Sequence, residues 1–575
     1  MGESVEGLDR EVDVVVVGAG AGGFVAALTA AADGLDTVLI EKASVYGGSS
    51  SLSGGGAWAP NAPEFRRLGE EDDPEKVVAY LQAIAPGVSL ARHERYVAEV
   101  PKVMEFLERS PHFENGFFWA KGYSDYHPEK GGSALGRGLW PSPIDKRKLG
   151  ADEGGLRGGT ARIPGAPKGL WLTSVDYHQL IGLRWGGWRG RKMMARLAGR
   201  VIKARITGER MAASGQALIG RLVLSLRDAG VPLLLETPMR SLLTDASGRV
   251  VGVEAERDGQ VVRFMARRGV IVATGGFEHN VAMREEYQPL VGKGWPVGSP
   301  DNTGDGIQAG ASLGAAVDLM DDAWWMPVMK LPAGVWPLVS ERGFPGQFIV
   351  NGAGRRFTNE SSPYTDFVHD QLAGHETGVS HIPVYMVIDD RAWKRNIIAG
   401  HLPGKAIPQA WLESGCIQIG QTFEELAGKL GIPPEALRET ADRFNAFARQ
   451  GKDEDFGRGD SPYDNYYGDP SYPNPNLAEV SQAPFYAFTL LPGDLGTKGG
   501  LLTDDEGRVL RPDGSVIPGL YATGNASASV MGNDYAGPGA TIGPAMTFGW
   551  VAAHHIASSG PEAEPVPAAV TDATA

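Results

Sequence analysis

The stretch VDVVVVGAGAGGFVAALTAAADGLDTVLIEK, residues 12–42, decides the fold of this chain. It begins with a valine-rich run, as expected of a strand that is buried on both faces of a parallel sheet. The pattern G-x-G-x-x-G follows at Gly18, Gly20 and Gly23, then an alanine-rich helix and a second strand that ends at Glu41. Strand, glycine turn, helix, strand and acid in this order form the dinucleotide-binding fingerprint.

Each residue of this fingerprint has its own physical role. Gly18 permits the tight turn, Gly20 lets a pyrophosphate approach a helix N-terminus, and Gly23 allows helix and strand to pack closely. Glu41 can accept hydrogen bonds from a ribose diol, and its negative charge disfavours a 2′-phosphate. NAD and FAD therefore remain as candidate cofactors.

Three more glycine-rich segments favour FAD. KASVYGGSSSLSGGGAW (42–58) follows the second strand directly, whereas ARRGVIVATGGFEHN (266–280) and IPGLYATGNAS (517–527) are each a strand that ends in a glycine loop. Because these loops lie far apart in the sequence, they suggest one long cofactor that both ends of the chain contact. A simple NAD domain does not need this.

Composition narrows the class of protein. The net charge of −15 argues against nucleic-acid binding. A single cysteine, Cys416, excludes disulfide frameworks, zinc fingers and cysteine-ligated iron–sulfur clusters, and we predict no metal site. The N-terminus does not resemble a secretory signal, and no apolar run approaches the ~20 residues that span a bilayer. We therefore expect a cytoplasmic protein.

The order of the glycine segments resembles the fumarate reductase/succinate dehydrogenase flavoprotein superfamily. The fingerprint, GGSS…SGGG, VIVATGGFEHN, NTGDG (302–306) and GLYATGNAS carry this resemblance. It implies an α/β fold: a Rossmann-like FAD-binding domain with an α+β catalytic domain inserted before the last flavin strand. The expected parts are 1–320 and 497–560 for the FAD-binding domain, 321–496 for the catalytic domain, and a disordered tail at 561–575.

We expect FAD to be held non-covalently, because the first histidine, His93, lies well past the serine- and glycine-rich loop. The predicted cofactor-binding residues are Gly18, Gly20, Gly23, Glu41, Lys42, Gly48, Ser49, Ser50, Gly54, Gly55, Ala273, Thr274, Gly275, Asn302, Asp305, Gly524, Asn525 and Ile542.

The loop MGNDYAGPGATIGPAMTFG (531–549) indicates the substrate class. Between residues 520 and 551 there is no Lys, Arg or His, so a dicarboxylate bound there would lack a compensating cation. Fumarate reductases resemble one another in placing an arginine in this loop, and the chain departs from them here. We therefore expect a neutral substrate. The hydroxyl of Tyr535 and the N–H of Gly539 can form a two-donor oxyanion hole for a ketone.

The tyrosine-and-glycine loop is similar to that of the 3-ketosteroid dehydrogenases that desaturate ring A at C1–C2. This resemblance implies that Tyr535 and the N–H of Gly539 hold the C3 carbonyl and that Tyr364 removes the C2 proton. It further implies that Tyr126 hydrogen-bonds Tyr364 and that the flavin N5 receives hydride from C1. The motifs that carry the resemblance are GYSDYHPEKGG (122–132), MDDAWWMP (320–327), RRFTNESSPYTD (355–366), DLGTKGG (494–500) and NDYAGPG (533–539).

Several alternatives stay open at the level of the sequence. Tyr123 lies three residues before Tyr126 and competes with it for the supporting role. A C4–C5 desaturase of 5α-3-ketosteroids and, less favoured, a reductase of an unsaturated acid are alternative functions. The electron acceptor is expected to be external, a quinone or another carrier.

The stretch RWGGWRGRKMMARLAGRVIKAR (184–205) has eight Lys or Arg and no acid, although the protein as a whole is acidic. Basic residues interleaved with Trp and Met suit an anionic membrane surface. The alternative is an ordinary surface helix with snorkelling basic side chains. Membrane association through 184–205 is therefore a hypothesis.

Overall fold

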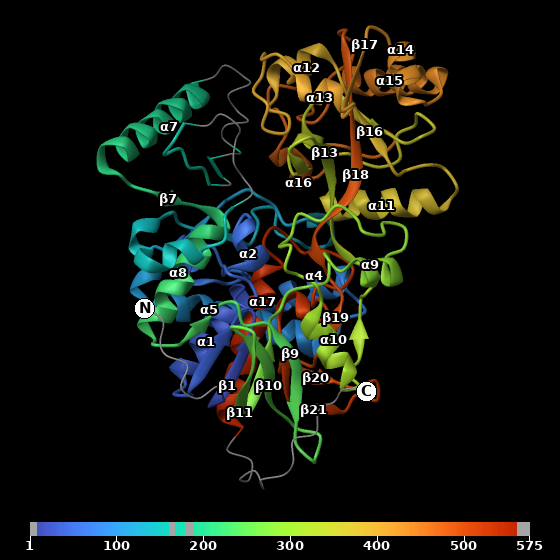
Figure 1. Cartoon of the computed structure of the whole chain (residues 1–575). Coiled ribbons are helices and arrows are strands. Elements are labelled where there is room, and N and C mark those ends of the chain that lie inside the picture. The colour runs from blue at the N-terminus through green and yellow to red at the C-terminus, as the bar shows by residue number, and fades with distance from the viewer. Residues whose placement is uncertain (1–8, 160–166, 174, 177, 179–187, 560–575) are drawn as a thin grey trace.

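The computed structural model describes residues 9–159, 167–173, 175–176, 178 and 188–559, so the predicted tail at 561–575 lies outside them. A mixed sheet occupies the lower half of the molecule in Figure 1. Its order is β20-β21-β11-β1-β2-β8, and β10 pairs with both β11 and β9. The strands are β1 (Arg10–Val17), β2 (Thr37–Ile40), β8 (Leu233–Leu234), β9 (Met239–Thr244), β10 (Val250–Arg257), β11 (Gln260–Val272), β20 (Arg508–Leu510) and β21 (Val516–Ala522).

Strand β1 is the central element, and it runs parallel to both of its neighbours, β11 and β2. Val14 and Val16 belong to the core that contains helix α1 (Ala21–Ala32) and helix α17 (Ile542–Ser558). Val15 and Val17 belong to the core on the other face of the sheet, shared with β10 and β21. Burial on both faces explains why the sequence here is a continuous valine run rather than an alternating one.

Helices α1 and α17, from opposite ends of the chain, pack backbone against backbone. A Cβ atom on Gly549 would lie 2.5 Å from the carbonyl oxygen of Gly22, and one on Gly22 would lie 2.8 Å from the carbonyl oxygen of Ala545. Only glycine permits so close an approach at these positions. The last helix therefore completes the layer that the first helix begins.

An antiparallel sheet forms the upper half of the molecule in Figure 1, with order β14-β13-β18-β16-β15 and β17 also paired to β18. Helices α14 and α15 cover one face of it, and α11 packs against β13. After β18 the chain returns to the first sheet through β20 and β21. This topology agrees with an inserted α+β unit; the boundaries at 320 and 496 stay predictions. The bounds are β13 (Ala323–Leu331), β14 (Gly334–Pro337), β15 (Gln347–Val350), β16 (Val384–Ile388), β17 (Ile417–Gly420), β18 (Phe485–Thr497), α11 (Tyr364–Glu376), α12 (Asp390–Arg395), α13 (Gln409–Glu413), α14 (Phe423–Leu430), α15 (Pro434–Gln450) and α16 (Pro462–Tyr466).

Short strands and further helices surround the first sheet, and α7 projects to the upper left in Figure 1. Among the helices of the described residues, none combines the length and apolarity needed to cross a bilayer. The remaining elements are α2 (Gly48–Leu52), α3 (Pro63–Arg67), α4 (Pro74–Ile84), α5 (Leu90–Glu108), α7 (Trp188–Thr207), α8 (Ser214–Asp228), α9 (Val281–Tyr287), α10 (Asp305–Ser312), β3 (Ala57–Trp58), β4 (Phe117–Trp119), β5 (Gly138–Pro141), β6 (Ile144–Asp145), β7 (Met211–Ala212), β12 (Val317–Asp318) and β19 (Gly500–Leu501).

Candidate active site

One cavity of about 1250 Å³ lies where the two sheets meet. Its wall includes Gly18 and Glu41, which directly follow β1 and β2, together with Met326 from β13 and Tyr364 from α11. Pockets for one small ligand usually measure ~300–1,000 Å³. The cavity is therefore large enough for a dinucleotide together with a second, smaller ligand.

The fingerprint glycines form one end of this cavity. Gly18 has φ +107°, and a Cβ atom there would lie 2.3 Å from the carbonyl oxygen of Ala273. A Cβ atom on Gly23 would lie 1.9 Å from the carbonyl oxygen of Gly18, so Gly23 serves helix packing and does not line the cavity. Gly20 differs, because the nearest atom to its Cβ position is the Ser50 hydroxyl at 3.8 Å. Its open side is the space that the backbone leaves for a ligand at the N-terminus of α1.

Glu41 is held rigidly by backbone donors. Its two carboxylate oxygens accept hydrogen bonds from the N–H groups of Ala19 at 2.8 Å and Ala43 at 2.9 Å. Burial raises the pKa of Glu41, and these two hydrogen bonds oppose that shift. Each oxygen retains a lone pair for a ribose hydroxyl. Nearby, Lys42 donates to Asp305 at 2.7 Å, so these two predicted cofactor residues bind each other.

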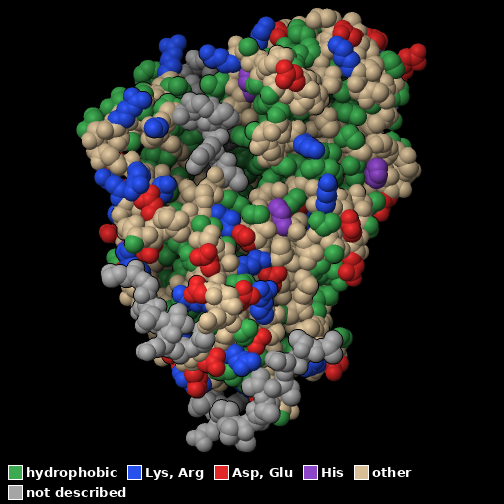
Figure 2. Space-filling view, in the orientation of Figure 1, with side chains coloured by type: hydrophobic (Ala, Val, Ile, Leu, Met, Phe, Trp, Pro, Cys, Tyr) green, Lys and Arg blue, Asp and Glu red, His purple; other side chains and the backbone are tan. Residues whose placement is uncertain are grey.

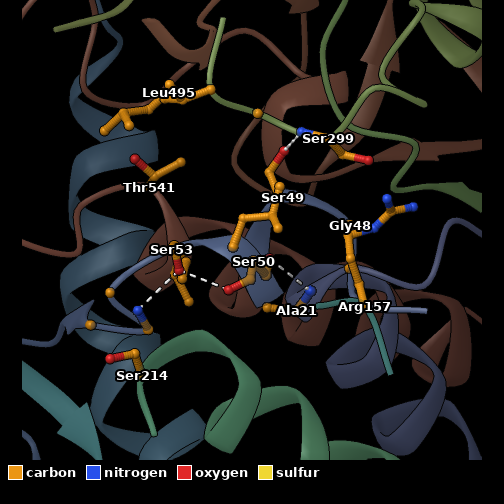
Figure 3. Close-up of a pocket in the computed structure, with 18 of the residues that line it drawn as sticks. Ala21, Gly48, Ser49, Ser50, Ser53, Arg157, Ser214, Ser299, Leu495 and Thr541 are labelled. Atoms are coloured by element: carbon orange, nitrogen blue, oxygen red, sulfur yellow. Dashed lines mark hydrogen bonds between the residues drawn. The ribbon is translucent and has the colours of Figure 1, made fainter. Parts of the chain in front are cut away.

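Figure 3 shows Ser49 and Ser50 of the serine-rich loop between Ala21, the first residue of α1, and Ser299. Ser50 accepts a hydrogen bond from the N–H of Ala21 at 3.2 Å and thus orients the start of α1. Ser49 accepts from the N–H of Ser299 at 2.8 Å and from the side-chain amide of Asn302 at 3.0 Å. These hydrogen bonds fix two loops that lie far apart in the sequence to the same wall of the cavity.

The donor set and the glycine cradle fit a dinucleotide. The predicted cofactor residues that line the cavity are Gly18, Gly20, Glu41, Lys42, Gly48, Ser49, Ser50, Gly54, Gly55, Ala273, Thr274, Gly275, Asn302, Asp305, Gly524, Asn525 and Ile542. Several other lining residues could not be predicted from the sequence, because they lie in no recognisable motif: Arg157, Ser214, Thr237, Met239, Val297, Ser299 and Asp301.

Three tyrosines from distant parts of the chain meet in the same cavity. The hydroxyl of Tyr126 donates to that of Tyr364 at 2.9 Å. Their rings and the ring of Tyr535 stand edge to face, with centroids 5.0–5.7 Å apart. All three side chains are buried. Such a cluster offers hydroxyl groups to a ligand in surroundings that exclude water.

Burial controls the protonation of these phenols. It raises the pKa of Tyr364 well above the ordinary value, and the hydrogen bond from Tyr126 opposes this shift. Burial also raises the pKa of Tyr535, against the hydrogen bonds of its hydroxyl with Thr541 and Tyr364. Burial thus favours the neutral phenol at both positions, and the Tyr126 hydrogen bond is the contact that acts in favour of an ionised Tyr364.

Gly539 and the start of α17 supply further donors. Among the described residues, the N–H of Gly539 has no hydrogen-bond acceptor, although its carbonyl oxygen accepts from the N–H groups of Trp58 and Gly543, each at 3.0 Å. Thr541, whose hydroxyl lies 2.9 Å from that of Tyr535, precedes the first residue of α17. Because a helix N-terminus carries partial positive charge, this wall favours negative charge on a ligand oxygen.

The geometry distinguishes Tyr126 from its sequence neighbour Tyr123. The Tyr123 hydroxyl accepts a hydrogen bond from Tyr467 at 3.0 Å, and its ring stacks on Tyr466 at 4.3 Å. Tyr123 therefore helps to build the wall, whereas the hydroxyl of Tyr126 contacts Tyr364. The apolar part of this wall consists of Trp140, Leu170, Trp171, Leu172, Met326, Val335, Trp336, Pro337, Val339 and Leu495.

Comparisons with known proteins identify the family and the fold of the chain. The FAD binding domain family matches residues 13–542. The 3-oxosteroid 1-dehydrogenase of Mycobacterium tuberculosis is 49% identical over 95% of this chain and 98% of its own length. A solved 3-ketosteroid Δ1-dehydrogenase from Sterolibacterium denitrificans, in complex with 1,4-androstadiene-3,17-dione, is 36% identical with a TM-score of 0.89 and covers 96% of this chain and 100% of its own.

A 3-ketosteroid-Δ4-(5α)-dehydrogenase structure from Rhodococcus jostii is more distant. It is 22% identical with a TM-score of 0.66 and covers 96% of this chain and 98% of its own. At this identity the likeness concerns the fold alone. The matches confirm the fold class and the FAD cofactor predicted from the sequence.

Proposed function

The chain belongs to the family of FAD-binding flavoproteins that contains the 3-oxosteroid 1-dehydrogenases, and we propose that it desaturates ring A of 3-ketosteroids between C1 and C2. The substrate loses a proton from C2 and a hydride from C1, and a C1–C2 double bond forms. FAD, when bound, supplies the hydride acceptor. The chain supplies the binding, the orientation and the proton acceptor.

The C3 carbonyl is held by the Tyr535 hydroxyl and the N–H of Gly539. Both groups line the cavity, and the N-terminus of α17 lies beside them. Donors directed at this oxygen stabilise the enolate that forms when the neighbouring C–H ionises. No cation is needed, in accord with a loop that has no Lys, Arg or His between residues 520 and 551.

The proton of C2 passes to the phenolate oxygen of Tyr364, which becomes the neutral phenol. Tyr126 donates to this oxygen at 2.9 Å and therefore favours the phenolate form of Tyr364. Enolate stabilisation at the carbonyl lowers the base strength that Tyr364 must supply. The convergence of the three tyrosines in one buried wall, with their rings 5.0–5.7 Å apart, is the observation that carries this proposal.

The decisive experiment mixes the purified protein anaerobically with androst-4-ene-3,17-dione. We expect the oxidised flavin band to bleach and the product to have lost two hydrogen atoms at C1 and C2. Tyr364→Phe and Tyr535→Phe should lose this bleaching. Tyr385→Phe is a matched control, because Tyr385 lies in strand β16 and does not line the cavity. Wild-type bleaching in both site variants would refute the assigned roles.

The same experiment separates the nearest alternative. A C4–C5 dehydrogenase would leave androst-4-ene-3,17-dione unchanged and would convert a saturated 5α-3-ketosteroid to the 4-ene. Its product is a simple enone, whereas 1,2-desaturation of a 4-ene yields a cross-conjugated dienone with a different ultraviolet spectrum. A reductase of an unsaturated acid is disfavoured by the missing cation in the tyrosine loop.

Turnover also requires an electron acceptor outside the chain. We propose a quinone or another diffusible carrier, since the sequence has no second dinucleotide fingerprint. Anaerobic addition of menadione to the steroid-reduced protein should restore the oxidised flavin band within the turnover time, whereas NAD should not.

We further propose that helix α7 contacts an anionic membrane surface. Trp188, Met194, Ile202 and Ile206 on it are 50–79% exposed. Trp188, Ile202 and Ile206 fall on one helix face, since they are separated by nearly whole numbers of turns. Exposed basic residues flank this face: Arg191, Lys192, Arg196, Lys203 and Arg205. Figure 2 shows blue basic side chains gathered at the upper left, where α7 lies.

The opposite face of α7 packs against residues that line the cavity. Its Met193 and Leu197 pack against Leu170 and Leu172, which themselves line the cavity wall. Contact of α7 with a membrane would therefore bring the proposed steroid-binding wall close to the lipid surface. Of the predicted stretch 184–205, residues 184–187 lie outside the described residues.

Co-sedimentation with liposomes tests the membrane proposal. We expect binding to phosphatidylglycerol vesicles that weakens with salt and falls strongly in Trp188→Ser/Ile206→Ser. Val261→Ser is a matched control, because Val261 is 56% exposed on the distant strand β11. Binding that does not depend on anionic lipid, or an unaffected double variant, would contradict the proposal.

A further inference from the structure

Charged residues stand next to each of the three tyrosines in the sequence. His127 follows Tyr126, Asp534 precedes Tyr535, and Asp366 lies two residues after Tyr364. The structure brings these charged groups together. His127 Nε2 lies 2.6 Å from Asp534 Oδ1, and His127 Nδ1 lies 3.8 Å from Asp366 Oδ2.

This cluster is an ion-pair network around one buried histidine. The His127 side chain is only 4% exposed. Burial alone disfavours a charged ring, but hydrogen bonds to Asp534 and Glu129 raise the pKa of His127 to about 10. The ring is therefore an imidazolium with two donor nitrogens at neutral pH. Lys130 adds a longer contact to Asp534 at 3.4 Å.

The two residues beside Tyr126 in the sequence contact different parts of the molecule. Asp125, the residue before it, is bound inside the first domain by the indole N–H of Trp58 at 2.8 Å and by Arg137. His127, the residue after it, instead contacts the loop of Tyr535 and the helix that begins at Tyr364. Asp366 stands in the first turn of α11, an element of the second domain.

Resting on the proposed function, we infer that His127 is a positioning residue that fixes the spacing of Tyr126, Tyr364 and Tyr535. Its ring holds Asp534, and through it the tyrosine loop before α17, and it attracts Asp366 at the start of α11. Asp534 transmits this constraint directly, because its Oδ1 also accepts the backbone N–H of Tyr535 at 2.7 Å. None of these three groups lines the cavity, so they act through the tyrosines.

The spacing of the three tyrosines determines the rate. Proton removal and carbonyl binding demand that Tyr364 and Tyr535 sit correctly on one substrate at the same time. A displacement of about 1 Å can cost on the order of 100-fold in rate. The hydroxyl contact between Tyr126 and Tyr364 joins segments that are 238 residues apart, and a single hydrogen bond is a weak tether for them.

The test replaces His127 by Gln, which can still donate a neutral hydrogen bond to Asp534. We expect kcat for androst-4-ene-3,17-dione to fall at least about tenfold, with KM changed less than about threefold and FAD content unchanged. His112→Gln is the matched control, because His112 forms a similar pair with Asp228 at 2.7 Å and does not line the cavity. It should leave kcat unchanged.

A double-mutant cycle separates positioning from general stability. In the Tyr126→Phe background, His127→Gln should cost less than about twofold, because the tyrosine spacing is already disturbed. Full additivity, or an unchanged kcat in His127→Gln, overturns the inference. Should His127→Gln not fold, Asp534→Asn takes its place in the same cycle. If wild-type protein does not desaturate androst-4-ene-3,17-dione, the proposed function fails, and if Tyr364→Phe retains wild-type turnover, the proposed role of Tyr364 fails; both results differ from additivity in the cycle.

Discussion

Tyr364 stands in surroundings that oppose its ionised form. Burial raises its pKa well above the ordinary value, and the Tyr126 hydrogen bond recovers only part of the shift. A base with a raised pKa is mostly protonated at neutral pH, so the rate constant of flavin reduction should rise from about pH 6 to about pH 10. Stopped-flow bleaching at each pH measures it. A flat profile would speak against a titrating tyrosine, and Tyr126→Phe should move the rise to higher pH.

Gly539 has a backbone conformation that a side chain would disturb. Its φ is +93°, and a Cβ atom would lie 2.6 Å from backbone atoms of Gly56 and Trp58. Gly539→Ala must therefore shift the loop and its N–H group. We expect the rate of flavin reduction to fall on the order of 100-fold, as when one oxyanion donor is lost. Carbonyl-isotope shifts of a bound ketone in infrared spectra would report the weakened hydrogen bond.

Gly428 is the matched control for Gly539. It lies inside α14, and no atom lies within 4 Å of its Cβ position. Gly428→Ala should leave flavin reduction unchanged and stabilise the protein by roughly 0.5–1 kcal/mol, since alanine favours a helix interior. A similar loss of rate in both variants would mean that Gly539 has no special role.

At the residue scale, the sequence predicts those site residues that lie inside a recognisable local motif. Tyr126, Tyr364 and Tyr535 sit in motifs of distinctive composition, and the structure brings them together. The pairing of His127 with Asp534 cannot be predicted in this way, because it depends on loops that meet only after both domains have folded. The same holds for Arg157, which pairs with Asp301 across 144 residues of sequence.

The element that binds the cofactor is the unit β1–α1–β2. The Cβ position of Gly20 is free of protein contacts closer than 3.8 Å, so a larger side chain would fill ligand space without a clash inside the protein. Gly20→Val should lower FAD affinity at least about tenfold and leave the Tm of the apoprotein nearly unchanged. Equilibrium fluorescence titration with FAD measures the affinity. Unchanged affinity would mean that the cofactor does not pass this turn.

Elements with a strong local pattern are predicted well. The valine run and the alanine-rich helix are confirmed as β1 and α1. The run VPLLLET at 231–237 suggests a longer strand than β8, which pairs only at Leu233–Leu234. Its apolar pattern predicts burial but not where the partner strand ends.

For the whole molecule, stability should depend on a buried carboxyl group near the cofactor wall. Burial raises the pKa of Glu278 to about 8, with a contribution from nearby Asp494. Between about pH 4.5 and pH 8 the folded state thus binds a proton that the unfolded state has lost, so stability falls as pH rises through this window. Above it, the destabilisation is on the order of a few kcal/mol.

Glu278→Gln tests this directly. The variant should gain stability relative to wild type as pH rises from about 5 to about 8, because it has no proton to lose. Urea unfolding of both proteins at the same excess of FAD measures the difference in their free energies of unfolding. The contributions of other titrating groups cancel in this comparison. A constant difference across this range would show that Glu278 does not titrate in it. The raised pKa of His127, about 10, acts with the same sign at higher pH.

The packing of the first helix against the last has a consequence for how the protein is made. During synthesis the fingerprint emerges from the ribosome first, but its cavity lacks the wall formed by Gly524, Asn525 and Ile542 until nearly the whole chain has been translated. The Gly22–Gly549 contact can form only then. We therefore expect the complete FAD site to form only late in synthesis, and a nascent chain stalled before β21 to carry the dinucleotide motif yet remain colourless.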